Sequence, residues 1–150
     1  MEKQECPGEA YCTSHEDDAM EMFSVRTSER HQFVDITSQV QKCITEAGFE
    51  DGLVCIFVPH TTAGVTINEN ADPDVVYDLL NTLAKLIPER ANYRHVEGNS
   101  DSHVKSSLIA PSLLVIVERG RLQLGTWQAI YFAEFDGPRN RQCWVKMIGK

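Results

Sequence analysis

The stretch LLVIVERGRLQLGTWQAIYFAEFDGPRNRQCWVKMI, residues 113–148, decides the fold class. It contains three largely apolar runs, over residues 113–117, 127–135 and 142–148, and each has the length of one strand. Gly120 breaks the chain before a short segment at 121–124, and Asp136-Gly137-Pro138 separates the last two runs. These links have the length and composition of hairpin turns. The stretch therefore predicts an α+β protein rather than a doubly wound α/β fold.

The sequence before this stretch contains both helical and strand-like patterns of apolar residues. A first helix is expected to begin at an N-cap at Thr37 or Ser38 and to end at Gly48. A second begins at Asp72-Pro73, with aspartate as N-cap and proline at the first helical position, and Pro88 ends it. Further strands are expected over 22–27, 31–36, 53–58 and 62–69. The sequence thus predicts about seven or eight mostly antiparallel strands and two main helices, with an irregular polar loop over 88–107.

Charge divides the chain into a tail and a domain. Residues 1–21 carry seven acidic residues and one lysine, whereas the whole chain of 150 residues has a net charge of −8. We interpret residues 1–21 as a flexible acidic tail and residues 22–150 as a single domain. The tail lacks the apolar core of a signal peptide, and the five cysteines include no Cys-x-x-Cys pair. These features favour a soluble protein of the reducing cytoplasm.

Composition also excludes two kinds of partner. The negative net charge argues against a nucleic-acid-binding protein, which needs a concentrated basic face. No apolar run approaches the roughly 20 residues that a membrane-spanning helix requires. We therefore expect neither a nucleic acid nor a membrane as partner.

A first polar segment follows the predicted buried strand at 53–58. It begins with His60-Thr61-Thr62, and in an extended chain His60, Thr62 and Asn68 lie on one face. A histidine directly after a buried strand is held by a rigid scaffold and can face a cleft. A hydrogen-bonded structural role for this histidine is the simpler alternative.

The segment from His95 to Lys105 contains two histidines, two acids, a lysine and a Gly-Asn-Ser turn within eleven residues. His95 and His103 can join His60 in a three-histidine site for zinc or a similar divalent ion. Alternatively, the amides around Asn99 and Ser100 can bind an anion, with Lys105 close by. A solvated polar loop is the third interpretation of this segment.

A third group lies near the C-terminus. Gln128 and Glu134 fall on the same strand face as Ile130 and therefore need polar partners if they are buried. Arg139 and Arg141 either bind an anion or flank a hairpin. Trp127 is expected in the core or at a subunit interface.

Together these segments resemble the YjbQ-like family, which is described as secondary thiamine-phosphate synthases. The likeness runs from about Phe23 to Lys146 and rests on three motifs in order. They are His60-Thr61-Thr62-Ala63-Gly64 with residues 66–74, His95 through 97–101 to His103 and Lys105, and Gly120-Arg121-Leu122 with Leu124-Gly125-Thr126-Trp127-Gln128.

The resemblance implies a homotrimer with sheets packed around its threefold axis and a polar site near the subunit boundary. It makes His60, His95 and His103 the expected ligands of a divalent metal, Zn or Mg. Expected catalytic residues are His60, Glu97, Asp101 and His103. Substrate or phosphate binding is expected from Thr61, Thr62, Asn68, Asn99, Ser100, Lys105, Gln128 and Arg139.

The family activity would join hydroxymethylpyrimidine diphosphate to thiazole phosphate and release pyrophosphate, so the resemblance implies a thiamine-phosphate synthase-like transferase. Two alternatives stay open. One is a metal-dependent hydrolase of a small phosphorylated or amide substrate, with Glu97 activating a metal-bound water. The other is a non-catalytic trimeric protein that binds a small phosphorylated metabolite.

Overall fold

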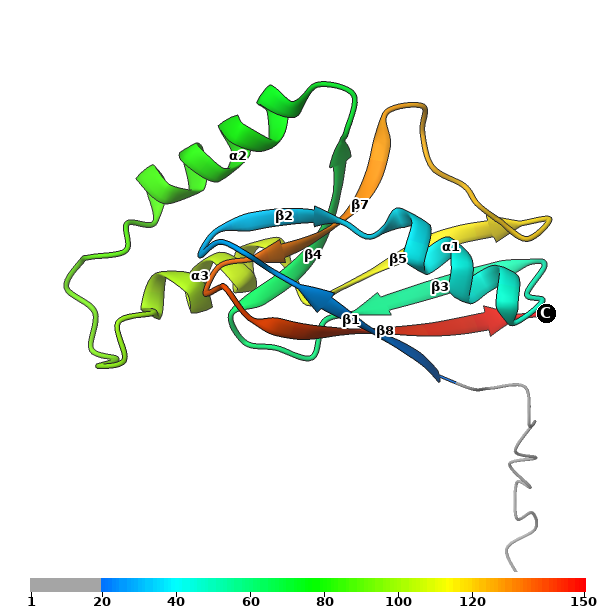
Figure 1. The fold of residues 1–150 in the computed structure, drawn as a ribbon, viewed down its shortest axis with the longest axis horizontal. Coiled ribbons are helices and arrows are strands. Elements are labelled where there is room, and N and C mark those ends of the chain that lie inside the picture. The colour runs from blue at the N-terminus through cyan, green and yellow to red at the C-terminus, as the bar shows by residue number, and fades with distance from the viewer. Residues whose placement is uncertain (1–19) are drawn as a thin grey trace, which may run out of the picture.

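The computed structural model describes residues 20–150, which form eight strands and three helices in two antiparallel sheets (Figure 1). This confirms the α+β class and the expected number of strands. The predicted tail lies outside the described residues, except for Met20 and Glu21, which begin the first strand. No helix among residues 20–150 has the length and apolar character that crossing a membrane would require.

The larger sheet has five strands, and its central strands come from distant parts of the chain. Its order is β1-β8-β3-β5-β6, and every neighbouring pair is antiparallel. The strands are β1 (Met20–Arg26), β8 (Asn140–Gly149), β3 (Gly52–Phe57), β5 (Ser112–Glu118) and β6 (Arg121–Leu122).

The smaller sheet has the order β2-β7-β4 and comprises β2 (Gln32–Asp35), β7 (Gln128–Glu134) and β4 (Ala63–Glu69). The register of β4 on β7 pairs Ala63 with Glu134 at one end and Glu69 with Gln128 at the other. Strands β4 and β7 are paired along their whole length. The chain segments at one end of this pair are therefore held at a fixed distance from those at the other end.

The hydrophobic core lies between the two sheets and is closed by α1 (Thr37–Glu46). Alternate residues of β3 and β8, such as Val54, Ile56 and Val145, point inward and are buried with Val40 and Ile44 of α1. Helix α1 begins one or two residues earlier than expected, because its N-cap is Ile36 rather than Thr37 or Ser38. The Asp35 carboxylate accepts hydrogen bonds from the Thr37 amide and hydroxyl and so supports this start.

The opposite face of the five-stranded sheet, which we call the outer face, is apolar and exposed. Leu114 and Ile116 of β5 are 59% and 53% exposed, and Ile148 of β8 is 51% exposed. Register places Leu53 beside both Ile116 and Ile148, and Phe57 beside Trp144. Monomeric proteins rarely expose large contiguous apolar patches of this kind.

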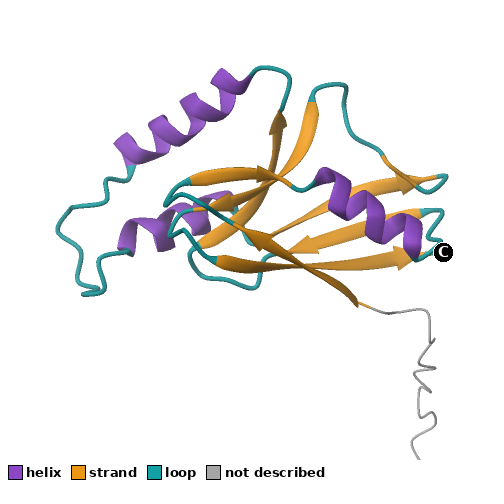
Figure 2. Cartoon of the chain, in the orientation of Figure 1, coloured by secondary structure: helices purple, strands orange, loops and turns teal. Residues whose placement is uncertain are grey.

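Helix α2 (Pro73–Leu86) begins as the sequence predicts, with Asp72 accepting a hydrogen bond from the Asp74 amide and Pro73 at the first position. It carries an apolar stripe, yet none of its residues is buried. Figures 1 and 2 show it as a separate arm above the two sheets. Helix α2 therefore leaves much of its apolar side uncovered in a single chain.

Helix α3 (Ser100–Ile109) is the main correction to the sequence prediction, which placed an irregular loop over 88–107 and only two main helices. Its buried residues are Asp101, Ser102, Lys105 and Ser106, so its inward side is polar. A search for apolar residues at helical spacing finds helices with an apolar inner face and misses this one.

Candidate functional site

An ion pair buried beneath α3 fixes the position of this helix. Lys105 and Asp101 are one turn apart, and the Lys105 Nζ donates to Asp101 Oδ2 at 2.7 Å. Both side chains are almost fully buried, with 1% and 0% exposure. From the turn after β1, Arg30 donates to the other Asp101 oxygen at 3.0 Å and to the Gly98 carbonyl. Helix α3 is thereby attached to the β1–β2 turn.

The charges around Asp101 determine its ionisation. Burial acts to raise the pKa of the Asp101 carboxyl, but the hydrogen bond and charge of Lys105, together with Arg30, outweigh burial and hold this pKa below its usual value. Asp101 is therefore an anion already balanced by two cations. His31 lies against the same group, with its Nε2 3.3 Å from Lys105 Nζ. Burial and the Lys105 charge lower the pKa of His31.

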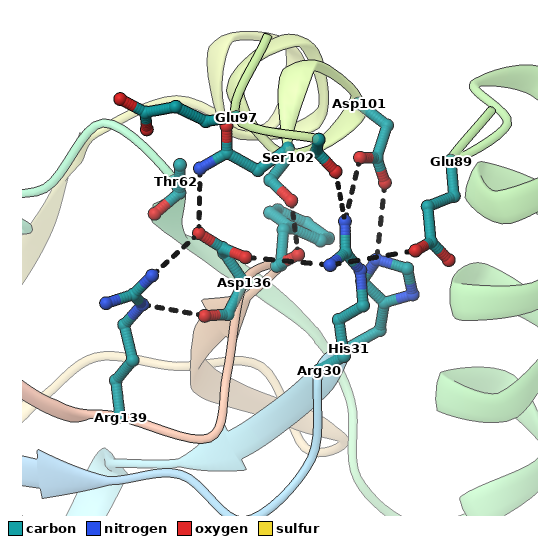
Figure 3. A network of polar contacts seen from close by, with 12 residues as sticks. Arg30, His31, Thr62, Glu89, Glu97, Asp101, Ser102, Asp136 and Arg139 are labelled. Carbon is teal, nitrogen blue, oxygen red and sulfur yellow. Dashed lines mark hydrogen bonds and ion pairs between the residues drawn. The ribbon is translucent and has the colours of Figure 1, made fainter. Parts of the chain in front are cut away.

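Asp136 is the centre of a second, adjoining set of contacts. Its carboxylate accepts from Asn99 Nδ2 at 2.9 Å and from Arg139 at 3.0 Å, and lies 3.7 Å from Arg30 (Figure 3). Ser102 donates to the Phe135 carbonyl beside it. These contacts join the first turn of α3 to the end of β7.

A pocket of about 370 Å³ opens on the outward side of α3, and it is lined by Tyr93, Arg94, His95, Ser100, His103 and Val104. The rings of His95 and His103 meet edge to face with centroids 5.3 Å apart. The Glu97 carboxylate lies 3.6 Å from His95 Nε2 and is mostly exposed. The pocket thus gathers an arginine and two histidines next to the first turn of a helix.

His60 lies in a different environment. Its Nε2 accepts a hydrogen bond from the Gln142 amide at 2.9 Å. Burial first, and then the Arg141 charge, lower the pKa of His60. The Arg141 side chain is already hydrogen-bonded: its Nε donates to the Glu134 carboxylate at 2.8 Å, and its Nη2 donates to the Thr62 hydroxyl oxygen. Glu134 is fully buried. Its hydrogen bonds with Arg141 and with the Thr27 hydroxyl supply the polar partners that a buried glutamate needs.

Asn68 and Gln128 lie at the far ends of β4 and β7, away from α3. Asn68 Oδ1 accepts from the Glu69 amide, and Gln128 Oε1 accepts from the Gly125 amide. Asn68 is five residues from Ala63 and Gln128 is six residues from Glu134, so both lie roughly 17–20 Å from the Ala63–Glu134 end.

The structure therefore divides the predicted site residues into separate groups. His95, Ser100 and His103 line the pocket, with Glu97 beside them, while Asn99, Asp101, Lys105 and Arg139 belong to the contacts around α3. Thr62 and His60 lie near Arg141, and Thr61 offers its backbone carbonyl to Ser106. Within residues 20–150 no three metal-ligating side chains gather, so one chain does not form the three-histidine site.

Sequence reasoning missed Arg30, His31, Tyr93 and Arg94. Arg30 lies between the expected strands at 22–27 and 31–36, and its partner Asp101 is 71 residues away in the sequence. The four-residue spacing of Asp101 and Lys105 was the available signal, because it places opposite charges on one side of a helix.

A family model described as "UPF0047 protein YjbQ-like" matches residues 21–150 of the chain. Among curated proteins, UPF0047 protein MJ1081 of Methanocaldococcus jannaschii is 53% identical over 127 residues, which are 85% of this chain and 92% of that protein. UPF0047 protein YugU of Bacillus subtilis is 50% identical over 131 residues, 87% of this chain and 99% of YugU.

Solved structures agree with the fold described above. An uncharacterized conserved protein of the YjbQ/UPF0047 family from Clostridium acetobutylicum superposes with a TM-score of 0.84 at 55% identity, covering 85% of this chain and 99% of that one. A protein of unknown function from Sulfolobus solfataricus, SSO2532, gives a TM-score of 0.85 at 29% identity, with 89% and 98% coverage.

These findings correct the functional expectation that the sequence raised. The relatives bear the names of UPF0047 proteins, and the similar structures are described as uncharacterized or of unknown function. None of these descriptions gives thiamine-phosphate synthase activity, so the predicted coupling reaction is wrong as an assignment. The descriptions do not support the expected transferase class either.

Proposed function

The chain belongs to the UPF0047 YjbQ-like family, and from this premise we propose that the pocket beside α3 binds a small phosphorylated metabolite. The observation that carries the proposal is the meeting of Arg94, His95 and His103 around one pocket at the start of α3. Arginine is a strong ligand for phosphate, and histidines add positive charge when they are protonated.

The first turn of α3 adds backbone donors to these side chains. Asn99 makes no side-chain hydrogen bond that caps the helix. The initial N–H groups and the helix dipole therefore favour an anion next to Ser100. Asp101 in the same turn does not oppose this, because Lys105 and Arg30 bind its carboxylate on the inward side of the helix.

The size of the pocket suits a small ligand. At about 370 Å³ it lies at the lower end of the usual range for small-molecule sites. Tyr93 and Val104 give it apolar walls, so an organic group attached to the phosphate has surface against which to pack. This favours an organic phosphate over a free inorganic ion.

We also propose that the protein is a homotrimer in which the outer faces of three five-stranded sheets pack around the threefold axis. Its support is the exposed apolar surface that includes Leu114, Ile116 and Ile148, which is unfavourable in water. A divalent metal at the site stays a prediction, because one chain contributes only the pair His95 and His103 to the pocket.

Isothermal titration calorimetry with inorganic pyrophosphate, followed by organic phosphates, tests the pocket. We expect the wild type to bind and the double variant Arg94→Ala/His103→Ala to bind at least about tenfold more weakly, since charge-assisted hydrogen bonds are lost. Arg90→Ala is the matched control, because Arg90 is exposed in the same segment and does not line the pocket.

Two results would contradict the proposal. One is wild-type protein that binds neither pyrophosphate nor any of the organic phosphates. The other is equal loss of affinity in Arg90→Ala and in the pocket variant, which would indicate that only the general charge of the segment matters.

A further inference from the structure

Residues 88–98, which we call the pocket loop, lie between α2 and α3 and contain neither helix nor strand. They supply Tyr93, Arg94 and His95 to the wall of the pocket. At its beginning the loop continues from α2, none of whose residues is buried. The covalent connection to α2 therefore does little to fix the loop against α3.

A single side chain, that of Arg30, makes the hydrogen bonds and ion pairs between the pocket loop and the rest of the described chain. Its Nη2 donates to the Gly98 carbonyl at 3.4 Å, and its Nη1 lies 3.8 Å from Glu89 Oε1. The other bonds of the loop are internal, such as the one from the Tyr93 hydroxyl to the Pro88 carbonyl. Figure 3 shows Glu89 directed toward the Arg30 guanidinium. The two ends of the pocket loop thus meet at one guanidinium group.

Arg30 itself is held by a fixed part of the fold. Its carbonyl accepts a hydrogen bond from the Gly137 amide at 3.0 Å. Its guanidinium donates to buried Asp101 at 3.0 Å and lies 3.7 Å from the Asp136 carboxylate. The guanidinium therefore has a defined place between the first turn of α3 and the end of β7, and it gives the ends of the pocket loop a defined place as well.

The position of the pocket loop matters for binding because the loop carries charges of both signs. Arg94 favours an anion in the pocket, whereas the Glu97 carboxylate, which is 70% exposed and 3.6 Å from His95 Nε2, opposes one. A loop without a fixed position would present either charge. The affinity for a phosphate therefore depends on how the loop is held as well as on its net charge.

We propose that Arg30 is a positioning residue of the phosphate pocket: by binding both ends of the pocket loop, it holds Arg94 and His95 against α3 without lining the pocket itself. This rests on the proposed function, because the affinity that Arg30 raises is the affinity for the phosphate. When only a fraction of the molecules has the arrangement that binds, the apparent affinity falls by that fraction. Binding to a loop that is not held also has to order it, which is unfavourable.

Two variants that detach the loop test the proposal by isothermal titration calorimetry with inorganic pyrophosphate. Arg30→Ala removes both contacts and should bind at least about tenfold more weakly than the wild type. It also takes one of two cations from Asp101 and so lowers stability. Glu89→Ala is therefore the more decisive variant, because it leaves α3 untouched. It should bind about two- to fivefold more weakly, the scale of one partly exposed ion pair.

The sign of the Glu89→Ala effect separates positioning from general charge. Removal of an acid near a basic pocket by itself strengthens anion binding, whereas loss of positioning weakens it. Glu29→Ala is the matched control, since it removes an exposed carboxylate next to Arg30 that makes no hydrogen bond or ion pair with the pocket loop. An affinity of Glu89→Ala equal to or above that of the wild type, or the same loss in Glu29→Ala, overturns the proposal.

A measurement without ligand distinguishes failure of this inference from failure of the proposed function. The rate of trypsin cleavage after Arg94, followed by mass spectrometry under native conditions, reports how freely the pocket loop leaves its place. We expect this rate to rise at least about threefold in Glu89→Ala and to stay unchanged in Glu29→Ala. That result supports the positioning role of Arg30 even if the wild type binds no pyrophosphate. An equal rate in Glu89→Ala and the wild type overturns it, whatever the binding data show.

Discussion

Lys105 is a charged side chain in the interior of the protein, with 1% exposure. Replacing it by methionine keeps much of its volume but leaves Asp101 buried with Arg30 as its remaining cation. Removal of one partner of a buried ion pair usually costs about 3–5 kcal/mol of stability. We therefore expect Lys105→Met to lower the free energy of unfolding by about this amount, measured by urea denaturation.

The control for this variant is Lys42→Met. Lys42 also pairs with an acid four residues away, Glu46, at 3.7 Å, but both side chains are about 70% exposed. An exposed pair of this kind contributes at most about 1 kcal/mol. Equal effects of the two substitutions would show that the Lys105–Asp101 pair has no special structural importance.

His31 and His60 make stability depend on pH near neutrality. The fold lowers the pKa of both below the usual 6.5, chiefly by burial and then by the nearby charges of Lys105 and Arg141. The unfolded chain therefore binds protons more readily, and stability falls as pH decreases below about 6.5. The carboxylates facing these histidines, Asp101 and Glu134, have lowered pKa values and titrate at more acidic pH.

We expect the urea midpoint to fall between pH 7.5 and pH 5.5, and to fall less in the double variant His31→Gln/His60→Gln. The comparison within each protein removes the direct effect of the substitutions on stability. An unchanged slope in the double variant would assign the pH dependence to groups other than these two histidines.

Among the elements, α3 depends on a close approach to β4. A Cβ added to Gly64 would lie 2.6 Å from the Ala110 carbonyl oxygen and 3.3 Å from Ile109 Cγ2. Both belong to the end of α3, and a backbone oxygen cannot move without moving the helix. We expect Gly64→Ala to destabilise the protein by about 1–3 kcal/mol, as overpacking does, in thermal or urea unfolding.

Gly125→Ala is the control for this contact. Its added Cβ would meet the side-chain end of Gln128 at 3.2 Å, and this side chain is exposed and can shift. A substantially smaller loss of stability is therefore expected. If Gly64→Ala were as mild as Gly125→Ala, the contact between α3 and β4 would be looser than the structure shows.

Helix α2 could be predicted from the sequence alone, whereas helix α3 could not. Helix α2 has an apolar stripe, an aspartate N-cap and a proline at its start, and each of these signals is local, so its bounds are predicted almost to the residue. Helix α3 has a polar inner side, because it is attached through Asp101, Lys105 and Ser102 to Arg30 and Phe135 from distant parts of the chain. No local pattern contains that information.

The same distinction applies to the site. His95, Ser100 and His103 are close in sequence, and the polar segment that contains them was recognised as a candidate site. Arg94 and Tyr93 precede this segment in the sequence. They are identified as candidate site residues only because the structure places them in the wall of the pocket. His60 and Asn68 belong to the same sequence motif, but paired strands place Asn68 at the far end of β4. The expected strand over 62–69 already implied this separation, because an extended chain rises about 3.3 Å per residue.

At the scale of the whole molecule, the outer face of the five-stranded sheet predicts association. We expect the wild type to have about three times the chain mass of 16.9 kDa in multi-angle light scattering at micromolar concentration. Leu114→Glu/Ile116→Glu places two charges on this face and should yield monomers, because charges buried without partners are unfavourable.

The matched control is Lys42→Glu, which introduces an acid on the exposed side of α1, away from the outer face. It should leave the mass unchanged. A wild-type protein that is monomeric at this concentration, or a Leu114→Glu/Ile116→Glu variant with the mass of the wild type, would exclude the outer face as the interface.

The polar inner side of α3 also bears on the order in which the chain folds. We expect the collapse of apolar side chains to assemble the two sheets and α1 before this helix docks, because its buried residues are an acid, a lysine and two serines. A ten-residue helix is marginal in water by itself, so we expect residues 100–109 to acquire their structure only after Arg30 and the end of β7 are in place. Substitutions at Asp101 and Lys105 should then accelerate unfolding while leaving the refolding rate nearly unchanged, which is the behaviour of a segment that docks after the rate-limiting step.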